Sequence, residues 1–217
     1  MGKKLNEIGM KYVRLVLMIM FQVNFLYAQD KAVVPDLSDA SKWKLYNREM
    51  EMGDGLQLNA KPGDGMLVLQ DYTFENVTVE LFIKGENNPG QSFVGFAFHI
   101  QDESTFEAIY FRPFNFENPD RSGHSVQYIS HPEYTWSKLR VDSPGKYENK
   151  VSPVPDPDDW FKATIIINSP DVKVFVNDSD VPSLEVTMLS KQRKGGVGFW
   201  VGNNSRGSFR DLKITSK

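Results

Sequence analysis

Side chains that could hold a polar, ring-shaped ligand gather between positions 93 and 136 of this 217-residue chain. Imidazole, phenol, guanidinium and amide groups offer directional hydrogen bonds, and aromatic rings offer a flat apolar surface. The candidate ligand-binding residues are His99, Tyr110, Arg112, Asn115, Gln127, His131, Tyr134 and Trp136. Their types and spacing predict a binding face for a hydroxylated ring, because apolar ring faces stack on aromatic groups while hydroxyls need fixed polar partners.

Two predicted strands must position three of these groups, His99, Tyr110 and Arg112. The runs Phe93–Ile100 and Thr105–Arg112 flank the turn Gln101–Ser104 and predict a hairpin. Side chains alternate along a strand, so pairing Ile100 with Thr105 extends an apolar core face. The opposite face then carries His99 beside Phe106, Ala97 beside Ala108, Gly95 beside Tyr110 and Phe93 beside Arg112. Its small residues either leave room for a flat ligand or let a second layer pack closely.

The segment after a third predicted strand, Ser125–His131, supplies candidates for proton transfer. His131 and Glu133 are the candidate catalytic acid or base, and Arg112 could stabilise charge. Arg112 could equally well form a salt bridge to an acidic residue. Tyr134 and Trp136 could instead anchor their loop to the sandwich. Trp43, Trp160 and Trp200 are interpreted as core or sheet packing.

The sequence contains little that supports a metal site or a catalytic nucleophile. The chain has no cysteine, which excludes thiolate ligands and nucleophiles, and no Gly-x-Ser-x-Gly motif. The three histidines lack the spacing of zinc ligands. Calcium could bind Asp156–Asp159 or Asn177–Asp180, but neither segment matches a defined calcium loop. We therefore expect no metal and no cofactor.

The first 28 residues predict a signal peptide. Lys3, Lys4, Lys11 and Arg14 precede the apolar run Leu15–Phe21, and small Ala28 follows. A retained anchor is the alternative, and Met10 could be the true start. No cysteine follows the run, which excludes a lipoprotein. We expect a secreted or periplasmic protein with no membrane contact after cleavage.

The mature chain is acidic. Removal of residues 1–28 leaves 21 basic and 27 acidic residues, a formal net charge of −6. An acidic chain without a basic stripe is a poor partner for nucleic acid. The remaining residues, 29–217, are expected to form one domain.

Short runs rich in Val, Ile, Phe and Tyr follow one another through the mature chain, and helical periodicity is nearly absent. Beyond the central strands, the predicted ones are 55–60, 65–70, 77–84, 161–168, 172–176, 184–187, 196–201 and 209–215. Residues 141–159 are predicted to be a long surface connection. This pattern predicts an all-β protein, an antiparallel sandwich of two sheets.

The runs Trp160–Ile165, Val172–Asn177, Gly195–Gly202 and Phe209–Ile214 resemble the concanavalin A-like lectin/glucanase superfamily. The likeness is to its laminin-G-like and glycosyl hydrolase branch, common in secreted proteins of polysaccharide-degrading bacteria. It implies a jelly roll that binds sugar on or beside its concave sheet. The Glu-x-Asp-x-Glu motif of family 16 glycoside hydrolases is missing, so their carboxylate pair cannot be assigned.

These observations lead to a primary and two alternative functional hypotheses. The primary one is a secreted domain that recognises carbohydrate on its concave face. The alternatives are a glycoside hydrolase or related carbohydrate-cleaving enzyme with a non-standard active site, and a structural or partner-binding module of the cell envelope.

Overall fold

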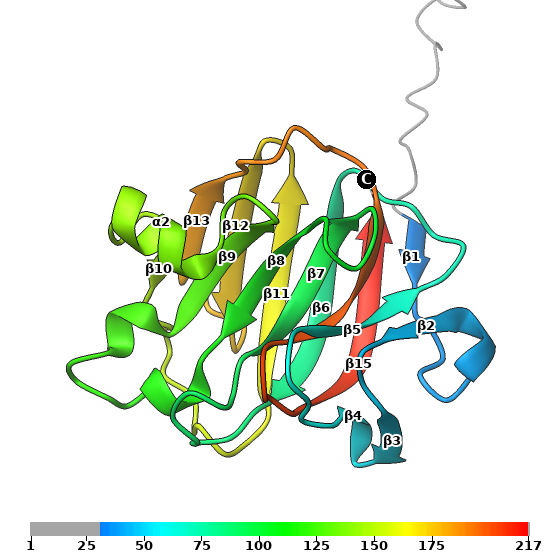
Figure 1. The fold of residues 1–217 in the computed structure, drawn as a ribbon, viewed down its shortest axis with the longest axis horizontal. Helices are drawn as coiled ribbons and strands as arrows, with labels where there is room; N and C mark the ends of the chain where they lie inside the picture. Colours follow the sequence, from blue (N-terminus) through cyan, green and yellow to red (C-terminus); the bar gives the residue numbers. More distant parts are fainter. Residues whose placement is uncertain (1–30, 217) are drawn as a thin grey trace, which may run out of the picture. The chain divides into compact units, whose positions relative to one another are not determined.

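The computed structural model describes residues 31–216, and the predicted signal segment lies outside them. Two antiparallel sheets face each other (Figure 1), as predicted for a jelly-roll sandwich. The eight-stranded sheet has the order β13 (Leu184–Thr187), β12 (Asp171–Val176), β11 (Phe161–Asn168), β6 (Val77–Lys84), β15 (Gly207–Ser216), β4 (Gly55–Leu58) and β3 (Met50–Gly53), and β1 (Lys31–Val33) also pairs with β15.

The second sheet has seven strands and carries four of the candidate binding residues, His99, Tyr110, Gln127 and His131. Its order is β10 (Glu148–Asn149), β9 (Val126–His131), β8 (Phe106–Phe111), β7 (Val94–Ile100), β14 (Gly196–Val201), β5 (Gly65–Leu69) and β2 (Trp43–Tyr46). Single-turn 3₁₀ helices cover Ala40–Lys42, Pro113–Asn115 and Ser122–His124. None of the helices among residues 31–216 is long and apolar enough to cross a membrane.

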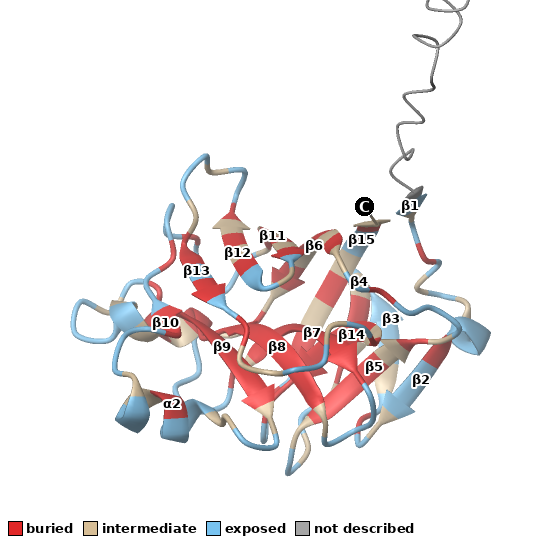
Figure 2. Cartoon of the chain, turned by 90° about the horizontal axis from the view of Figure 1, so that it is seen from above, coloured by how far each residue is buried: buried red, intermediate tan, exposed pale blue. Residues whose placement is uncertain are grey.

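The core lies between the two sheets. Along β6 the odd positions, Val77 to Ile83, are buried, whereas Glu80 points outward to Lys162 and Lys213. Figure 2 shows buried residues concentrated in the middle strands, with exposed residues at the edges. In β7 and β8 every residue is buried, so both faces of these strands are covered. Something besides the eight-stranded sheet must therefore cover the outer face of β8.

Part of that cover is α2 (Trp136–Asp142), a short helix beside β9 (Figure 1). Trp136 was expected in a loop and residues 141 and 142 in a long surface connection, and both expectations are wrong because residues 136–142 are helical. Thr135 caps the helix by accepting a hydrogen bond from the Lys138 N–H, and buried Leu139 anchors it. A single apolar anchor in seven residues leaves no helical periodicity to detect.

The predicted hairpin register is correct up to position 98. Phe98 faces Glu107, Ala97 faces Ala108 and Gly95 faces Tyr110. At His99 the strand bulges: three steps along β7, from Ala97 to Ile100, oppose two along β14. His99 takes a left-handed backbone conformation, with φ of 47°.

This bulge turns the His99 side chain into the core. Its Nδ1 lies 2.8 Å from Glu107 Oε2, and its Nε2 lies 3.0 Å from the Glu75 carbonyl oxygen. Tyr128 donates its hydroxyl hydrogen to the other oxygen of Glu107. The expectation that His99 shares the ligand-binding face with Tyr110 is therefore wrong, because one inserted residue reverses the side-chain alternation.

Candidate functional site

A pocket of about 270 Å³ opens on the outer face of the seven-stranded sheet, and we call it the central pocket. Its aromatic walls are Phe93, Tyr110, Trp136 and Trp200. The polar groups Asp64, His131, Thr135, Ser137 and Asn203 line it as well, together with Ile129 and Gly202. An apolar cavity with a few polar groups, near the lower end of the size range of small-molecule sites, suits one sugar ring.

The floor of the pocket is built across three strands. Gly95 of β7 lies in register between Tyr110 of β8 and Trp200 of β14. A Cβ at position 95 would approach the Tyr110 Cα to 2.6 Å, so glycine lets the strands carry these two large rings side by side. The ring centroids of Tyr110 and Trp200 are 5.0 Å apart. The small residues thus make room for aromatic residues, and Trp200, assigned to packing from the sequence, also lines the pocket.

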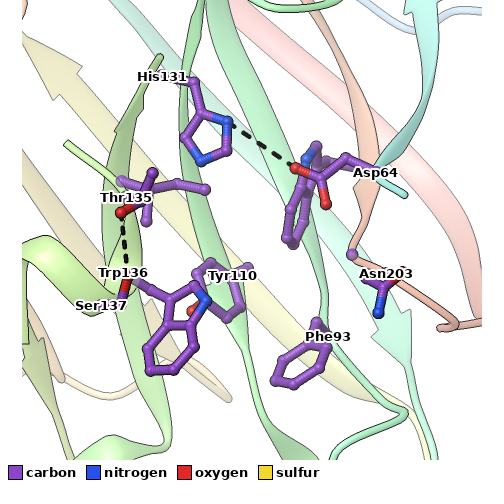
Figure 3. Close-up of a pocket in the computed structure, with 11 residues that line it drawn as sticks. Asp64, Phe93, Tyr110, His131, Thr135, Trp136, Ser137 and Asn203 are labelled. Atoms are coloured by element: carbon purple, nitrogen blue, oxygen red, sulfur yellow. Dashed lines mark hydrogen bonds and ion pairs between the residues drawn. The ribbon is translucent and has the colours of Figure 1, made fainter. Parts of the chain in front are cut away.

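Asp64 and His131 face each other at one side of the pocket (Figure 3). His131 ends β9, and its Nδ1 lies 3.9 Å from Asp64 Oδ2. Figure 3 shows the other ring nitrogen directed toward the interior of the pocket. A carboxylate beside one imidazole nitrogen favours the tautomer in which the other nitrogen is free to accept a proton.

Burial acts on the protonation of both groups. It lowers the pKa of His131 below the usual 6.5, opposed by the charge of Asp64. It raises the pKa of Asp64, opposed by the charges of His131 and Arg48 and by hydrogen bonds. His131 is therefore held as a neutral imidazole near neutral pH, the form that can act as a general base.

Asp64 is fixed by the turn that connects the two sheets. Residues 55–58 belong to one sheet and residues 65–69 to the other, so the connection between them crosses the sandwich instead of closing a hairpin. Asn47 donates to the Asp64 carbonyl oxygen over 2.9 Å, and Arg48 donates to that of Gly63 over 2.7 Å. No sequence pattern indicates this role, because Asp64 meets His131 only through the tertiary fold.

Arg112 and Gln127 lie beneath the pocket and do not line it. Both are buried, and the Arg112 guanidinium donates to the Tyr110 hydroxyl and to Gln127 Oε1. Tyr110 also donates to Gln127 Oε1 over 3.1 Å. Arg112 therefore positions Tyr110 from below, and its acidic neighbour is Glu148, at 3.7 Å.

Trp136 forms the outer wall and is the most exposed aromatic group of the site, at 49 %. The guanidinium of Arg140, one helical turn later, lies 5.1 Å from the centre of its ring. Arg140 in turn makes two hydrogen bonds to Glu148, of 2.9 and 2.6 Å. This chain of contacts braces a wall that otherwise stands in solvent.

The other predicted residues lie elsewhere. Glu133 is exposed beside Tyr134 and does not line the central pocket, and Tyr134 packs partly buried against the core. Asn115 is buried and lines a neighbouring cavity. Residues 31–216 contain no group of three or more His, Asp or Glu side chains arranged to hold a metal ion.

A protein-family model shows which family the chain belongs to. The sequence model described as the 3-keto-alpha-glucoside-1,2-lyase-like domain matches residues 33–215. The chain belongs to this family. No curated protein matches this lyase-like domain.

Solved structures share its sandwich fold. The carbohydrate binding module CBM66 from Bacillus subtilis aligns with a TM-score of 0.61 at 14% identity, over 84% of this chain and 100% of that one. A Bacillus subtilis protein with a galectin-like fold aligns at 0.57 and 13% identity, over 87% and 98%. The lumenal domain of VIP36, with Ca²⁺ and Man3GlcNAc bound, aligns at 0.57 and 11% identity, over 87% and 90%. At these identities the likeness establishes the concanavalin A-like and galectin-like fold of the lyase-like domain.

Proposed function

We propose that this domain binds a glycoside in the central pocket and cleaves it by 1,2-elimination, with His131 as the general base. The observation that carries the proposal is the His131 imidazole, 3.9 Å from the Asp64 carboxyl group in an aromatic-walled pocket, where burial lowers the pKa of His131. The family description supplies the substrate class, a 3-keto-α-glucoside. Carbohydrate is also the ligand named for two proteins of the same fold.

The chemistry suits a single base. A ketone at C3 of the sugar makes the hydrogen on C2 acidic, so an imidazole can remove it. A double bond then forms between C1 and C2, the bond from C1 to the glycosidic oxygen breaks, and the imidazolium returns its proton to the departing oxygen. Asp64 would hold the imidazole and stabilise the positive charge that forms on it. No redox change occurs in these steps.

The direct test compares methyl 3-keto-α-glucoside with methyl α-glucoside. We expect release of methanol from the keto sugar only, because the second compound lacks the carbonyl that acidifies C2. Exchange of the C2 hydrogen for deuterium in heavy water would report the first proton transfer separately. Binding of the keto sugar without release or exchange would instead identify a carbohydrate-binding domain that does not cleave its ligand.

Trp136 gives a prediction about binding. Replacing it with alanine should weaken binding of methyl α-glucoside about tenfold, since a stacking surface is lost. Stability should change little, because half of the side chain is exposed. Titration followed by NMR measures the affinity. Trp160→Ala, which removes a tryptophan that does not line this pocket, is the control and should leave the affinity unchanged.

The pH dependence follows from the lowered pKa of His131. A base works when deprotonated, so the rate should rise with pH through a midpoint below 6.5. Asp64→Asn removes a charge that raises this pKa, so the residual activity should rise at a still more acidic midpoint. Profiles of kcat/KM for both proteins check this. A midpoint in the variant above that of the wild type would contradict it.

A further inference from the structure

A second cavity, of about 420 Å³, adjoins the central pocket, and we call it the arginine cavity. Phe93 and Trp136 line both spaces, so these two rings form the boundary between them. A ligand that fills the central pocket and continues past this boundary enters the arginine cavity. In a glycoside, the group that follows the sugar ring is the leaving group.

The charge around this cavity is positive on balance. Arg112, Arg121 and Arg140 line it, against the carboxylates of Asp120 in the lining and Glu148 behind it. Burial raises the pKa of Glu148, but hydrogen bonds and charges from Arg140 and His124 outweigh this and hold the pKa below its usual value. Glu148 is therefore an anion already engaged by its neighbours.

Arg121 is the cation left for a ligand. It is exposed and forms no ion pair with any residue of the described part of the chain, 31–216, whereas Arg112 and Arg140 both lie near Glu148. A guanidinium presents a planar fork of donors that matches a carboxylate. An unpaired guanidinium at the rim of a cavity favours an acidic ligand.

Asn115 adds an independent sign of a ligand. Its side chain is 3 % exposed, and its Nδ2 donates to the His124 carbonyl oxygen over 3.2 Å. This hydrogen bond fixes which amide atom is the oxygen, and Oδ1 is buried without any hydrogen-bond partner. Buried polar atoms are nearly always satisfied, so this acceptor calls for a donor such as a hydroxyl group.

We propose that the arginine cavity is a leaving-group subsite for a hydroxylated ring that carries a carboxylate, that is, a uronic acid. Arg121 takes the carboxylate, Asn115 Oδ1 accepts from a ring hydroxyl, and Phe93 and Trp136 contact the ring at its junction with the sugar in the central pocket. This assignment rests on the proposed function, because it takes the central pocket as the site of the glycosyl unit.

The test uses two disaccharides that differ only in whether one carboxyl group is free or methylated. One has glucose α-linked (1→4) to glucuronic acid, and the other is its methyl ester. Without a C3 ketone neither should be cleaved, so titration calorimetry measures binding alone. At low salt we expect the acid to bind about tenfold more tightly than the ester. At about 1 M salt this preference should shrink, since charge interactions are screened.

Arg121→Gln should abolish the preference for the acid and leave the affinity for the ester unchanged. Lys173→Gln, which removes a charge of the same sign on β12 of the other sheet, should leave the preference intact. Equal affinities of the wild type for acid and ester would overturn the subsite while leaving the central pocket standing. Failure of both disaccharides to bind would overturn the central pocket as well. Retention of the preference in Arg121→Gln would remove Arg121 from the site.

Discussion

Replacing His131 with asparagine is expected to lower the rate of 3-keto-glucoside cleavage by roughly 10²- to 10⁴-fold, the usual contribution of a general base. Asparagine keeps a polar group of similar reach but cannot accept a proton near neutral pH. Affinity for methyl α-glucoside should change by only a few-fold, because the four aromatic walls remain. Initial rates and NMR titrations of the same preparations separate these two effects.

Glu133→Gln is the matched control for this experiment. Glu133 was the other catalytic candidate from the sequence, and it lies two residues from His131 but outside the central pocket. Its variant should retain the wild-type rate. A large rate loss in Glu133→Gln, with His131→Asn active, would reverse the assignment of the base.

The largest effect on stability is expected at Glu107, in the core behind the pocket. Glu107→Ala would leave the His99 ring nitrogen and the Tyr128 hydroxyl without their shared partner in a site where all three side chains are buried. Removing one member of a buried charged network costs about 3–5 kcal/mol of unfolding free energy. Urea denaturation followed by tryptophan fluorescence measures this.

Two further variants provide a scale for the stability loss expected in Glu107→Ala. Glu107→Gln keeps the size of the side chain and one acceptor oxygen. It should therefore lower the unfolding free energy by less than Glu107→Ala does. Glu80→Ala removes a carboxylate from the outer face of the other sheet, where the side chains of its partners Lys162 and Lys213 are 24% and 49% exposed. This change should lower the unfolding free energy by less than about 1 kcal/mol. A Glu107→Ala variant as stable as Glu80→Ala would mean that the core network contributes nothing to folding.

Period-two alternation predicted the sheet well, because it reports directly on burial. The strands at 77–84, 161–168, 184–187 and 196–201 have the predicted bounds, and Phe98 faces Glu107 as expected. The alternation breaks at His99, where one inserted residue reverses the face on which the side chain lies. A bulge at a non-glycine residue leaves no mark in the sequence pattern.

Part of the site could be predicted because several of its residues are close together in the sequence. Tyr110, His131 and Trp136 lie in one contiguous stretch, so local reasoning brought them together. Asp64 and Asn203 come from turns far away in the chain and reach the pocket only because the sheets are folded as they are. Arg112 was expected to contact the ligand on the same face, but it lies buried beneath Tyr110 and lines the arginine cavity instead of the central pocket.

Phe93 and Trp136 separate the central pocket from the arginine cavity, so each space can recognise a different part of the ligand. The proposed proton transfer takes place on one side of it, and whatever the glycosidic oxygen carries lies on the other. Residues such as Arg121 can therefore change in evolution or by design without disturbing Asp64 and His131. If the proposed functions of both cavities hold, the same proton-transfer residues would serve different conjugates, and the leaving-group side would set the substrate range.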